Sequence, residues 1–298
     1  PVVAITGRLE QIKQHRHAYQ EIDHRGPFEA VTKFHSQVTS ARELPFFLRQ
    51  AFREATTGTP GPTHLDLHGI DGTVVANEEA DLELIVEQPF TRVPPFRPEP
   101  ELELVREALG LLSSAKRPVI VAGGGVTASQ AQADLVALAE KLSIPVATAM
   151  NAKAAISADH PLAVGVPGNY SRSCANKIVC ESDLVFFVGS HTGGQLTHDW
   201  RIPPAGTTVI QVDINAAELG RSYPVRLGMQ GDARATLRKM LEECESGEPR
   251  TEWLDRVHQL IGEWREEVAP LVNSDDLPIR PERLCKELSE TLPSDAIL

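Results

Sequence analysis

Three consecutive glycines are the first residues whose type and spacing could serve chemistry. Gly123, Gly124 and Gly125 follow an apolar run at 119–122 and precede a helical pattern. Glycines at such a turn let a ligand phosphate approach the backbone, and the start of a helix favours an anion. The run lacks the G-x-G-x-x-G spacing and the later acidic residue of a dinucleotide-binding fingerprint. A tight turn between a strand and a helix is the alternative interpretation.

A second glycine-containing loop precedes a predicted helix at about 171–181. The start of this helix could also hold an anion, and the candidate contacts are Gly165, Pro167 and Gly168. The alternative is an ordinary loop in which Asn169 or Ser171 caps the helix.

Further candidates lie at the carboxyl ends of predicted strands, where open α/β sheets bind ligands. Asp213 could accept hydrogen bonds from ribose hydroxyls, or it could help a capping-box-like helix start formed by Asn215 and Glu218. Ser190 and His191 belong to a glycine-rich loop that follows the most apolar strand. His191 could bind a ligand or carry a proton, and a solvated loop histidine is the alternative.

Neither the remaining histidines nor the cysteines have the spacing of a metal site. The sequence also shows no pair of a catalytic nucleophile and a general base at a recognisable spacing. Four histidines gather early in the chain, and we expect them on the surface: His15, His17, His24 and His35. The four cysteines form no C-x-x-C pair, which argues against a structural zinc site. Their scatter in a long chain indicates reduced thiols in a cytoplasmic protein. We predict no metal ligand in this sequence.

Strands and helices that could position these residues alternate along the chain. The predicted strands cover 2–6, 64–67, 119–122, 146–148, 183–188 and 208–212. The predicted helices cover about 44–55, 101–114, 131–142, 171–181, 232–244 and 251–268, and one follows Pro281 to about 291. Apolar strands that alternate with helices predict an α/β fold with parallel sheets covered by helices on both faces.

Composition shifts divide the chain into blocks. Residues 1–87 form a first block, and the prolines within 88–100 mark a semi-rigid, extended linker. Residues 101–245 form a second block, and 246–298 begin with another linker. Predicted strands stand at the very start and at 295–298, so we expect an interior piece of a longer chain.

The composition excludes some classes of partner. The chain has 298 residues, 32.5 kDa and a formal net charge of −12 from 29 basic and 41 acidic residues. Such a charge argues against nucleic acid and against an anionic membrane surface. The hydrophobic share of 41% is enough for a packed core. No apolar run approaches about 18 residues, so no membrane-spanning helix is predicted.

An ordered series of short motifs resembles the thiamine diphosphate-dependent enzymes of the acetolactate synthase and 2-oxo acid decarboxylase type. The first block carries the initial strand at 1–7, A-Y-Q-E at 18–21, V-T-K at 31–33, and G-T-P-G-P at 58–62 before L-D-L at 65–67. The second carries R-P-V-I-V-A-G-G-G at 117–125, D-H-P-L-A-V-G at 159–165, V-D-I-N-A-A-E at 212–218 and G-D-A at 231–233. The resemblance covers essentially the whole chain in one unbroken order.

The resemblance implies a domain organisation. It implies a complete central DHS-like, or Rossmann-like, domain at 101–245. This domain would stand between the later half of a pyrimidine-binding domain at 1–87 and the start of a diphosphate-binding domain within 246–298. The implied cofactors are thiamine diphosphate and Mg²⁺, held mainly by segments outside this sequence. The family's activating glutamate and its G-D-G…N motif have no counterpart here, so we expect this piece alone not to turn over substrate.

The same resemblance points to candidate catalytic residues. Gln20 matches the glutamine that approaches the cofactor in acetolactate synthases, and Tyr19 stands where many relatives have phenylalanine. Those enzymes also carry a lysine shortly after the strand that contains Asp66, whereas the stretch here is His68-Gly69-Ile70. This departure weakens a strict acetolactate synthase assignment.

The central domain of the family holds FAD in some members and ADP or nothing in others. FAD-binding synthases have an arginine in the loop where this sequence reads Ser190-His191-Thr192, so FAD and ADP both stay open. If a nucleotide binds, the resemblance carries its contacts onto Gly124, Gly165, Pro167, Gly168 and Asp213.

The predicted function is therefore part of a 2-oxo acid decarboxylase or carboligase that forms a homodimer or homotetramer. The alternative is a non-catalytic nucleotide-binding or regulatory module built on the central domain. A sirtuin-like NAD-dependent deacylase would share the sheet type, but the sequence lacks the paired C-x-x-C zinc ligands.

Overall fold

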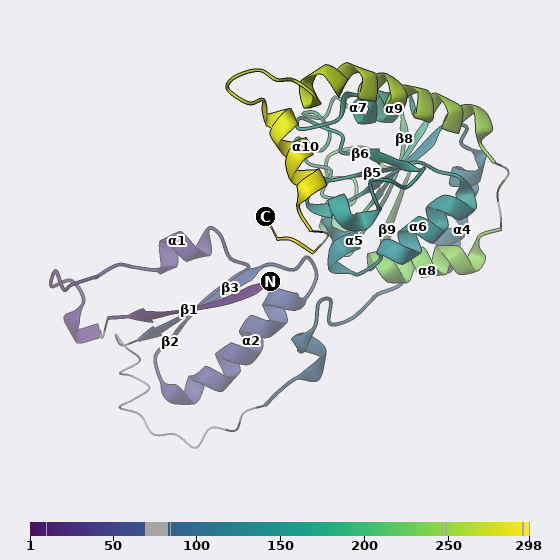
Figure 1. Ribbon diagram of the computed structural model, residues 1–298. Helices are drawn as coiled ribbons and strands as arrows, with labels where there is room; N and C mark the ends of the chain where they lie inside the picture. Colours follow the sequence, from purple (N-terminus) through teal and green to yellow (C-terminus); the bar gives the residue numbers. More distant parts are fainter. Residues whose placement is uncertain are drawn as a thin grey trace. The chain divides into compact units, whose positions relative to one another are not determined.

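The computed structural model describes residues 1–9, 11–68, 83, 85–245, 247, 249–293 and 295–297 (Figure 1). Two compact units make up the chain: unit 1 spans Pro1–Pro98, and unit 2 spans Glu99–Leu298. The division falls within the predicted linker at 88–100. Gly69 and Ile70, which belong to the stretch compared with the family's lysine position, lie outside the described residues.

Unit 1 is built on a three-stranded parallel sheet. The strand order is β1 (Val2–Arg8), β3 (Pro62–His68), β2 (Phe34–Val38). Helix α2 (Leu44–Thr56) covers one face, where Leu65, Val38 and Ala51 form the buried core. The shorter elements are η1 (Gln11–Lys13), α1 (Arg25–Glu29), η2 (Ala41–Glu43) and η4 (Gln88–Thr91).

Strand β2 was not predicted, because its polar side chains make the alternation of apolar and polar residues hard to recognise in the sequence. Phe34 and Val38 contribute to the apolar side that faces α2, whereas His35 and Gln37 belong to the opposite face of the sheet. An edge strand that is apolar on one face only gives a weak sequence signal.

Glu87, just before the predicted linker, and the first residues of the linker pack against α2. The carboxylate of Glu87 accepts hydrogen bonds from the guanidinium groups of Arg49 and Arg53. These two arginines lower the pKa of Glu87 to about 2. The Arg53 guanidinium also lies over the ring of Phe90, 4.4 Å from its centroid. Paired charges and a cation–π contact therefore attach residues 87–90 to α2.

Unit 2 contains a six-stranded parallel sheet. In spatial order the strands are β6 (Ala163–Gly165), β5 (Val146–Thr148), β4 (Pro118–Ala122), β7 (Leu184–Val188), β8 (Thr208–Asp213) and β9 (Leu227–Gln230). From β4 the chain proceeds outward to β5 and β6, and then returns to β7 on the other side of β4. The strand order thus reverses between β4 and β7, which is the place where open sheets form ligand crevices.

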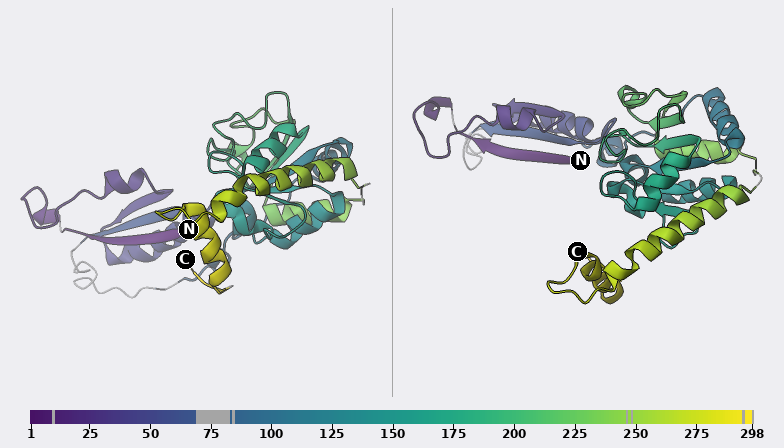
Figure 2. Two further views of the ribbon diagram at one scale, coloured as in Figure 1. Left: turned by 45° about the horizontal axis from the view of Figure 1, so that its top comes forward. Right: turned by 90° about the horizontal axis from the view of Figure 1, so that it is seen from above.

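Helices cover both faces of this sheet (Figures 1 and 2). On one face, α4 (Leu102–Ser114), α6 (Gln132–Leu142) and α8 (Ala233–Glu243) contribute to one buried cluster with Ile120 and Phe186. On the other, α7 (Ser173–Glu181) and α9 (Thr251–Val272) contribute to a second cluster with Val121 and Phe187. Neighbouring residues of β4 and β7 enter opposite clusters, which explains why these strands read as continuous apolar runs. The predicted α/β class with helix-flanked parallel sheets is confirmed.

Helix α9 belongs to unit 2, which extends past the boundary predicted at residue 245. Trp253 is buried, and its indole Nε1 donates a 3.0 Å hydrogen bond to the carbonyl of Pro118. Just before α9, the guanidinium of Arg250 donates to the carbonyls of Leu112 and Leu142. Those carbonyls lie in the last turns of α4 and α6, where helices lack internal partners. The sequence suggested that 246–298 form a separate block, because a polar linker precedes α9 and no local pattern indicates its packing on unit 2.

The C-terminal segment differs from the prediction as well. Helix α10 (Pro281–Thr291) forms as predicted, but the described residues 295–297 are not part of a strand. No described strand pairs with them, and the Ala296 N–H donates instead to the nearby Pro293 carbonyl at 3.0 Å. Residue 298 lies outside the description. None of the described helices is long and apolar enough to cross a membrane.

The docking of α9 can be tested at Trp253. We expect Trp253→Ala to lower the free energy of unfolding of unit 2 by about 3–5 kcal/mol, because it removes a buried aromatic side chain. Trp253→Phe should cost about 1 kcal/mol, because the Pro118 carbonyl loses its donor. Urea titration followed by the fluorescence of the two remaining tryptophans, both in unit 2, measures these changes. Glu252→Ala on the exposed side is the control, and equal effects of all three variants would contradict the docking.

Candidate functional site

The carboxyl edge of the unit 2 sheet brings together three of the predicted groups. Gly123–Gly125 follow β4, Ser190 and His191 follow β7, and Asp213 is the last residue of β8. Because the strands are parallel, all three groups stand at one edge, on both sides of the reversal in strand order.

The space around the glycine triplet is filled by the chain itself. The Gly125 N–H donates to the Gly189 carbonyl at 2.9 Å, and a Cβ at Gly125 would lie 2.7 Å from the Gly189 Cα. A Cβ at Gly123 would meet Gly189 and Ser190. A Cβ at Gly124 would meet only the side-chain amide of Asn151, at 2.7 Å. The close backbone approach that requires Gly123 and Gly125 is thus to the loop after β7, as the tight-turn interpretation expects.

The loop after β6 is likewise shaped by contacts within the protein. Gly165 and Gly168 have φ values of +91° and +106°, which favour glycine. A Cβ at Gly168 would collide with the backbone of Gln195 and Leu196. The Asn176 side chain accepts from the Gly168 N–H at 2.7 Å and donates to its carbonyl at 3.1 Å.

The capping predicted for the next helix is wrong. Helix α7 begins after Arg172 without a side-chain cap, so neither Asn169 nor Ser171 caps this helix. Asn169 donates instead to the Asp199 carboxylate at 3.3 Å. The hydroxyl of Ser171 accepts from the Asn176 amide at 2.8 Å. Pro167 is buried next to this network in the sequence, and its side chain has no polar atom.

Asp213 is a buried carboxylate at the sheet edge. It is 4% exposed, and its Oδ1 accepts a 2.9 Å hydrogen bond from the Asn215 N–H. Burial raises the pKa of Asp213, while the Asn215 amide and nearby His191 oppose that shift. Asn215 in turn caps η6 (Ala216–Glu218) through the Ala217 N–H. Asp213 therefore assists the cap, as the alternative interpretation held, and keeps further acceptor capacity.

The loop after β7 is tied down by a residue that sequence reasoning missed. Gln211 donates from Nε2 to the Ser190 carbonyl at 3.1 Å and accepts from the Gly220 N–H at 2.9 Å. Ser190 is buried, whereas His191 is exposed. Thr192 is 2% exposed, and its hydroxyl has no hydrogen-bond partner among the described residues. A polar residue within an apolar strand was the signal that could have found Gln211.

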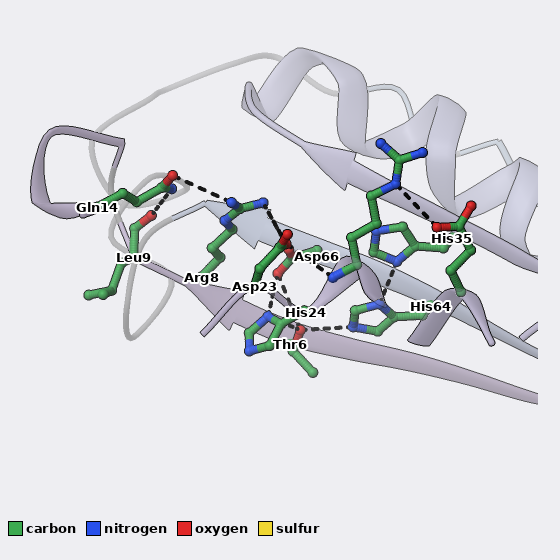
Figure 3. Close-up of polar contacts among 11 residues, drawn as sticks. Thr6, Arg8, Leu9, Gln14, Asp23, His24, His35, His64 and Asp66 are labelled. Atoms are coloured by element: carbon green, nitrogen blue, oxygen red, sulfur yellow. Dashed lines mark hydrogen bonds and ion pairs between the residues drawn. The ribbon is translucent and has the colours of Figure 1, made fainter. Parts of the chain in front are cut away.

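Unit 1 contains a second polar cluster, on the face of its sheet opposite α2 (Figure 3). In the strand register Thr6 lies beside Asp66, and His35 lies beside His64. His64 and Asp66 are both 0% exposed. From the segment before α1, His24 turns its Nδ1 toward Asp66 Oδ1 at 2.9 Å.

The hydrogen bonds of this cluster run in one direction. An ionised Asp66 only accepts, so the Thr6 hydroxyl donates to it at 3.3 Å and accepts from His64 Nε2 at 2.8 Å. A neutral His64 then accepts at Nδ1 from His35 Nδ1, which lies 2.8 Å away. Burial, and next the neighbouring His35, lower the pKa of His64 to about 4. The cluster therefore holds His64 neutral at ordinary pH.

Two histidines expected on the surface belong to this cluster. His24 and His35 are half-buried and bonded within it, so that expectation is wrong for them, whereas His15 and His17 are exposed as predicted. The alternation of polar and apolar residues from His64 to His68 was the overlooked sequence signal, because alternate residues of a strand share a face.

The predicted catalytic residues occupy the tip of a turn in unit 1. Tyr19 is 83% exposed, and Gln20 has φ of +58°. The Glu21 N–H donates to the Ala18 carbonyl at 3.1 Å, which closes the turn. The Glu21 carboxylate accepts from the N–H groups of Ala18 and His15. The His15 bond is the main cause of a lowered pKa at Glu21.

Comparison with known proteins gives a consistent family. Residues 105–240 match the model described as the thiamine pyrophosphate enzyme, central domain. The chain is 35% identical over 297 residues to a probable acetolactate synthase large subunit of Methanocaldococcus jannaschii, covering 98% of this chain and 49% of that protein. It is 32% identical to the acetolactate synthase large subunit of Corynebacterium glutamicum, with 100% and 47% covered.

A relative with another name matches over a similar range. The glyoxylate carboligase of Escherichia coli O157:H7 is 28% identical, with 99% of this chain and 49% of that protein covered. The chain thus spans about half the length of the curated relatives it matches.

The packing role of the triplet predicts different tolerance at neighbouring glycines. Gly125→Ala should lower the free energy of unfolding of unit 2 by about 1–3 kcal/mol, because its methyl group would press on the Gly189 backbone. Gly124→Ala should change it by less than about 1 kcal/mol, because only a flexible side chain must shift. Urea titration with tryptophan fluorescence gives both values, and equal losses would contradict this assignment.

The neutral state of His64 predicts a pH dependence of unit 1. Its pKa of about 4 lies below the 6.5 of an unfolded histidine, so the unfolded state takes up the proton first. The stability is complete above pH 6.5 and falls as the pH decreases toward 4. The His64 contribution should decrease by about 2 kcal/mol between about pH 7.5 and pH 5.

Comparison of the wild type with His64→Gln isolates this contribution, because the carboxylates titrate in both proteins. The methyl NMR signals of Leu65 and Leu67 report unfolding of unit 1 in urea at each pH. His17→Gln, which changes an exposed histidine of the same unit, is the matched control. An identical pH dependence in the wild type and His64→Gln would show that His64 is not the group responsible.

Proposed function

This chain belongs to the thiamine diphosphate-dependent enzyme family, with its central domain at 105–240, and from that premise we propose that it is part of a 2-oxo acid decarboxylase or carboligase of the acetolactate synthase type. The observation that carries the proposal is the extent of the similarity. The relatives match 98–100% of the chain, so the similarity includes unit 1 and does not stop at the central domain. A nucleotide-binding module built on the central domain alone would not account for that.

Thiamine diphosphate, when bound, supplies a nucleophilic carbon that adds to the carbonyl of a 2-oxo acid. We propose that Gln20 and Tyr19 face the bound cofactor or substrate. Their support is the motif around them and their place at the exposed tip of a closed turn. From that place, the Gln20 side-chain amide can donate and accept hydrogen bonds and so orient a polar substrate group.

The proposal includes Mg²⁺ as the second cofactor, but not ligands for it among the described residues. No group of three or more histidine, cysteine, aspartate or glutamate side chains in the described part of the chain is placed to hold a metal ion. We therefore assign no metal ligand among the residues that the structure describes.

For the central domain we propose FAD or ADP as a ligand at the carboxyl edge of the sheet. The buried Thr192 hydroxyl and the Asp213 carboxylate suit the hydroxyl groups of a nucleotide. Gly123 and Gly125 do not suit its phosphates, because the loop after β7 occupies their surroundings. Gly124, Ser190 and His191 are the remaining candidates for its contacts, whereas Gly165, Pro167 and Gly168 are explained by packing within the protein.

The proposed enzyme is a cytoplasmic homodimer or homotetramer. The support for the compartment is that all four cysteines are free thiols. The support for the assembly is the family resemblance alone.

Activity measurements test the proposal. The protein purified from its natural source should decarboxylate pyruvate or glyoxylate when supplied with thiamine diphosphate and Mg²⁺. Gln20→Ala should lower kcat/KM by about tenfold or more, because a positioned contact is lost. Gln50→Ala, on the exposed surface of α2, is the control and should match the wild type. Absence of 2-oxo acid turnover by the purified wild type would refute the proposed activity. Full activity of Gln20→Ala would refute the proposed role of Gln20.

A further inference from the structure

Asp66 is placed to control the segment that carries Tyr19 and Gln20. This residue lies on the central strand β3, and its side chain is 0% exposed. A buried carboxylate requires hydrogen bonds or opposite charges, since its desolvation is costly. Figure 3 shows which side chains meet it: Thr6 from β1, Arg8 from the end of β1, and His24 from the segment before α1. We call the described residues 11–24 the Gln20 loop: Arg8 precedes this loop, and His24 is its last residue.

The exit of the Gln20 loop is held by His24. Its Nδ1 donates to Asp66 Oδ1 at 2.9 Å, and the Thr6 hydroxyl lies 3.3 Å from the same nitrogen. The side chain of His24 is 17% exposed, so it is well shielded from competing water. Only two residues separate His24 from Glu21, whose carboxylate closes the turn at Tyr19 and Gln20. The His24 bond therefore fixes the turn from its C-terminal side.

The entry of the loop is held by Arg8. Its Nη1 lies 3.7 Å from Asp66 Oδ2, and its Nη2 donates to the Gln14 side-chain oxygen at 3.4 Å. Gln14 donates in turn to the Leu9 carbonyl at 3.0 Å. Both oxygens of one carboxylate thus face groups that hold opposite ends of the same loop.

Apolar burial does not provide an alternative hold on this loop. Its large apolar side chains Ile12, Tyr19 and Ile22 are 75%, 83% and 56% exposed. Three of its residues also have positive φ: His15, His17 and Gln20. Such conformations in residues other than glycine persist only where the surroundings enforce them. Polar contacts must therefore supply that constraint.

We propose that Asp66 is the positioning residue for the Gln20 loop: through Arg8 at its entry and His24 at its exit, it sets where Tyr19 and Gln20 stand relative to the sheet. One part of this inference rests on the proposed function, namely that the loop is held in place in order to present Gln20 to cofactor or substrate. The holding of the loop itself is a property of the folded chain and requires no reaction to measure.

Limited trypsin digestion measures this holding. Arg16 lies in the exposed part of the loop, whereas Arg53 lies in α2, so cleavage after Arg16 reports local opening and cleavage after Arg53 reports unfolding of unit 1. Mass spectrometry of the early fragments gives both rates. We expect His24→Ala to speed cleavage after Arg16 about tenfold, because it removes a charge-assisted hydrogen bond. The rate after Arg53 should stay within about twofold of the wild type, since α2 packs on the opposite face.

A conservative variant separates positioning from a general loss of packing. The amide nitrogen of asparagine takes the place of the histidine Nδ1, so His24→Asn should keep the Asp66 bond and restore cleavage after Arg16 to within about twofold of the wild type. Asp66→Asn removes the charge that attracts Arg8 and leaves only a neutral amide oxygen to accept from His24, so it should also speed cleavage after Arg16. His17→Asn is the control, because His17 is exposed and asparagine tolerates its positive φ.

The proposal is overturned by either of two results. One is unchanged cleavage after Arg16 in both His24→Ala and Asp66→Asn. The other is a parallel rise of cleavage after Arg16 and Arg53 in His24→Ala, with no rescue in His24→Asn. Loss of the proposed function would look different, because Gln20→Ala would then leave turnover unchanged while the cleavage pattern of the His24 variants persisted.

Discussion

Parallel pairing of the strands is the constraint on which every candidate site of this chain depends. Because the strands of each sheet run in the same direction, the turns after β4, β7 and β8 meet at one edge of unit 2. In unit 1 the same pairing places Thr6 beside Asp66 and His35 beside His64. Residues far apart in the sequence become neighbours through the register of the sheet.

Burial of polar groups is the second constraint, and it follows from the first. A parallel sheet is normally covered on both faces, so polar side chains on its strands must find partners within the protein. The cluster around His64 solves this with hydrogen bonds that run from His35 through Thr6 to Asp66. Gln211 solves it by joining the loop after β7 to the Gly220 backbone. In both cases a buried polar residue organises a loop next to a candidate site.

The glycines show how close packing and ligand binding compete as explanations. Gly125 and Gly189 allow two backbone segments to touch where the strand order reverses. Packing within the protein therefore explains why glycine is needed at these positions. The proposal of a ligand depends instead on the polar groups nearby. In unit 2 these groups are Asp213 and Thr192. In unit 1 the candidate contacts are Tyr19 and Gln20, which lie in a closed turn.

Local patterns in the sequence determined the α/β class and most of the elements. The helix predicted at 44–55 and the strands at 119–122 and 183–188 match α2, β4 and β7 closely, because periodicity and turn residues act over short distances. Ordered motifs of the same local kind indicated the family, which the similarity of relatives confirmed.

Tertiary structure alone decided the strand order, the place of α9 and the partners of the histidines. Edge strand β2 was not predicted because only one of its faces is apolar. Helix α9 was predicted, but its packing on unit 2 was not, because its partner on β4 lies far away in the sequence. The same distance separates Asp66 from Arg8 and His24. No spacing rule relates those residues, because the sheet register and the path of the Gln20 loop bring them together only when the chain has folded.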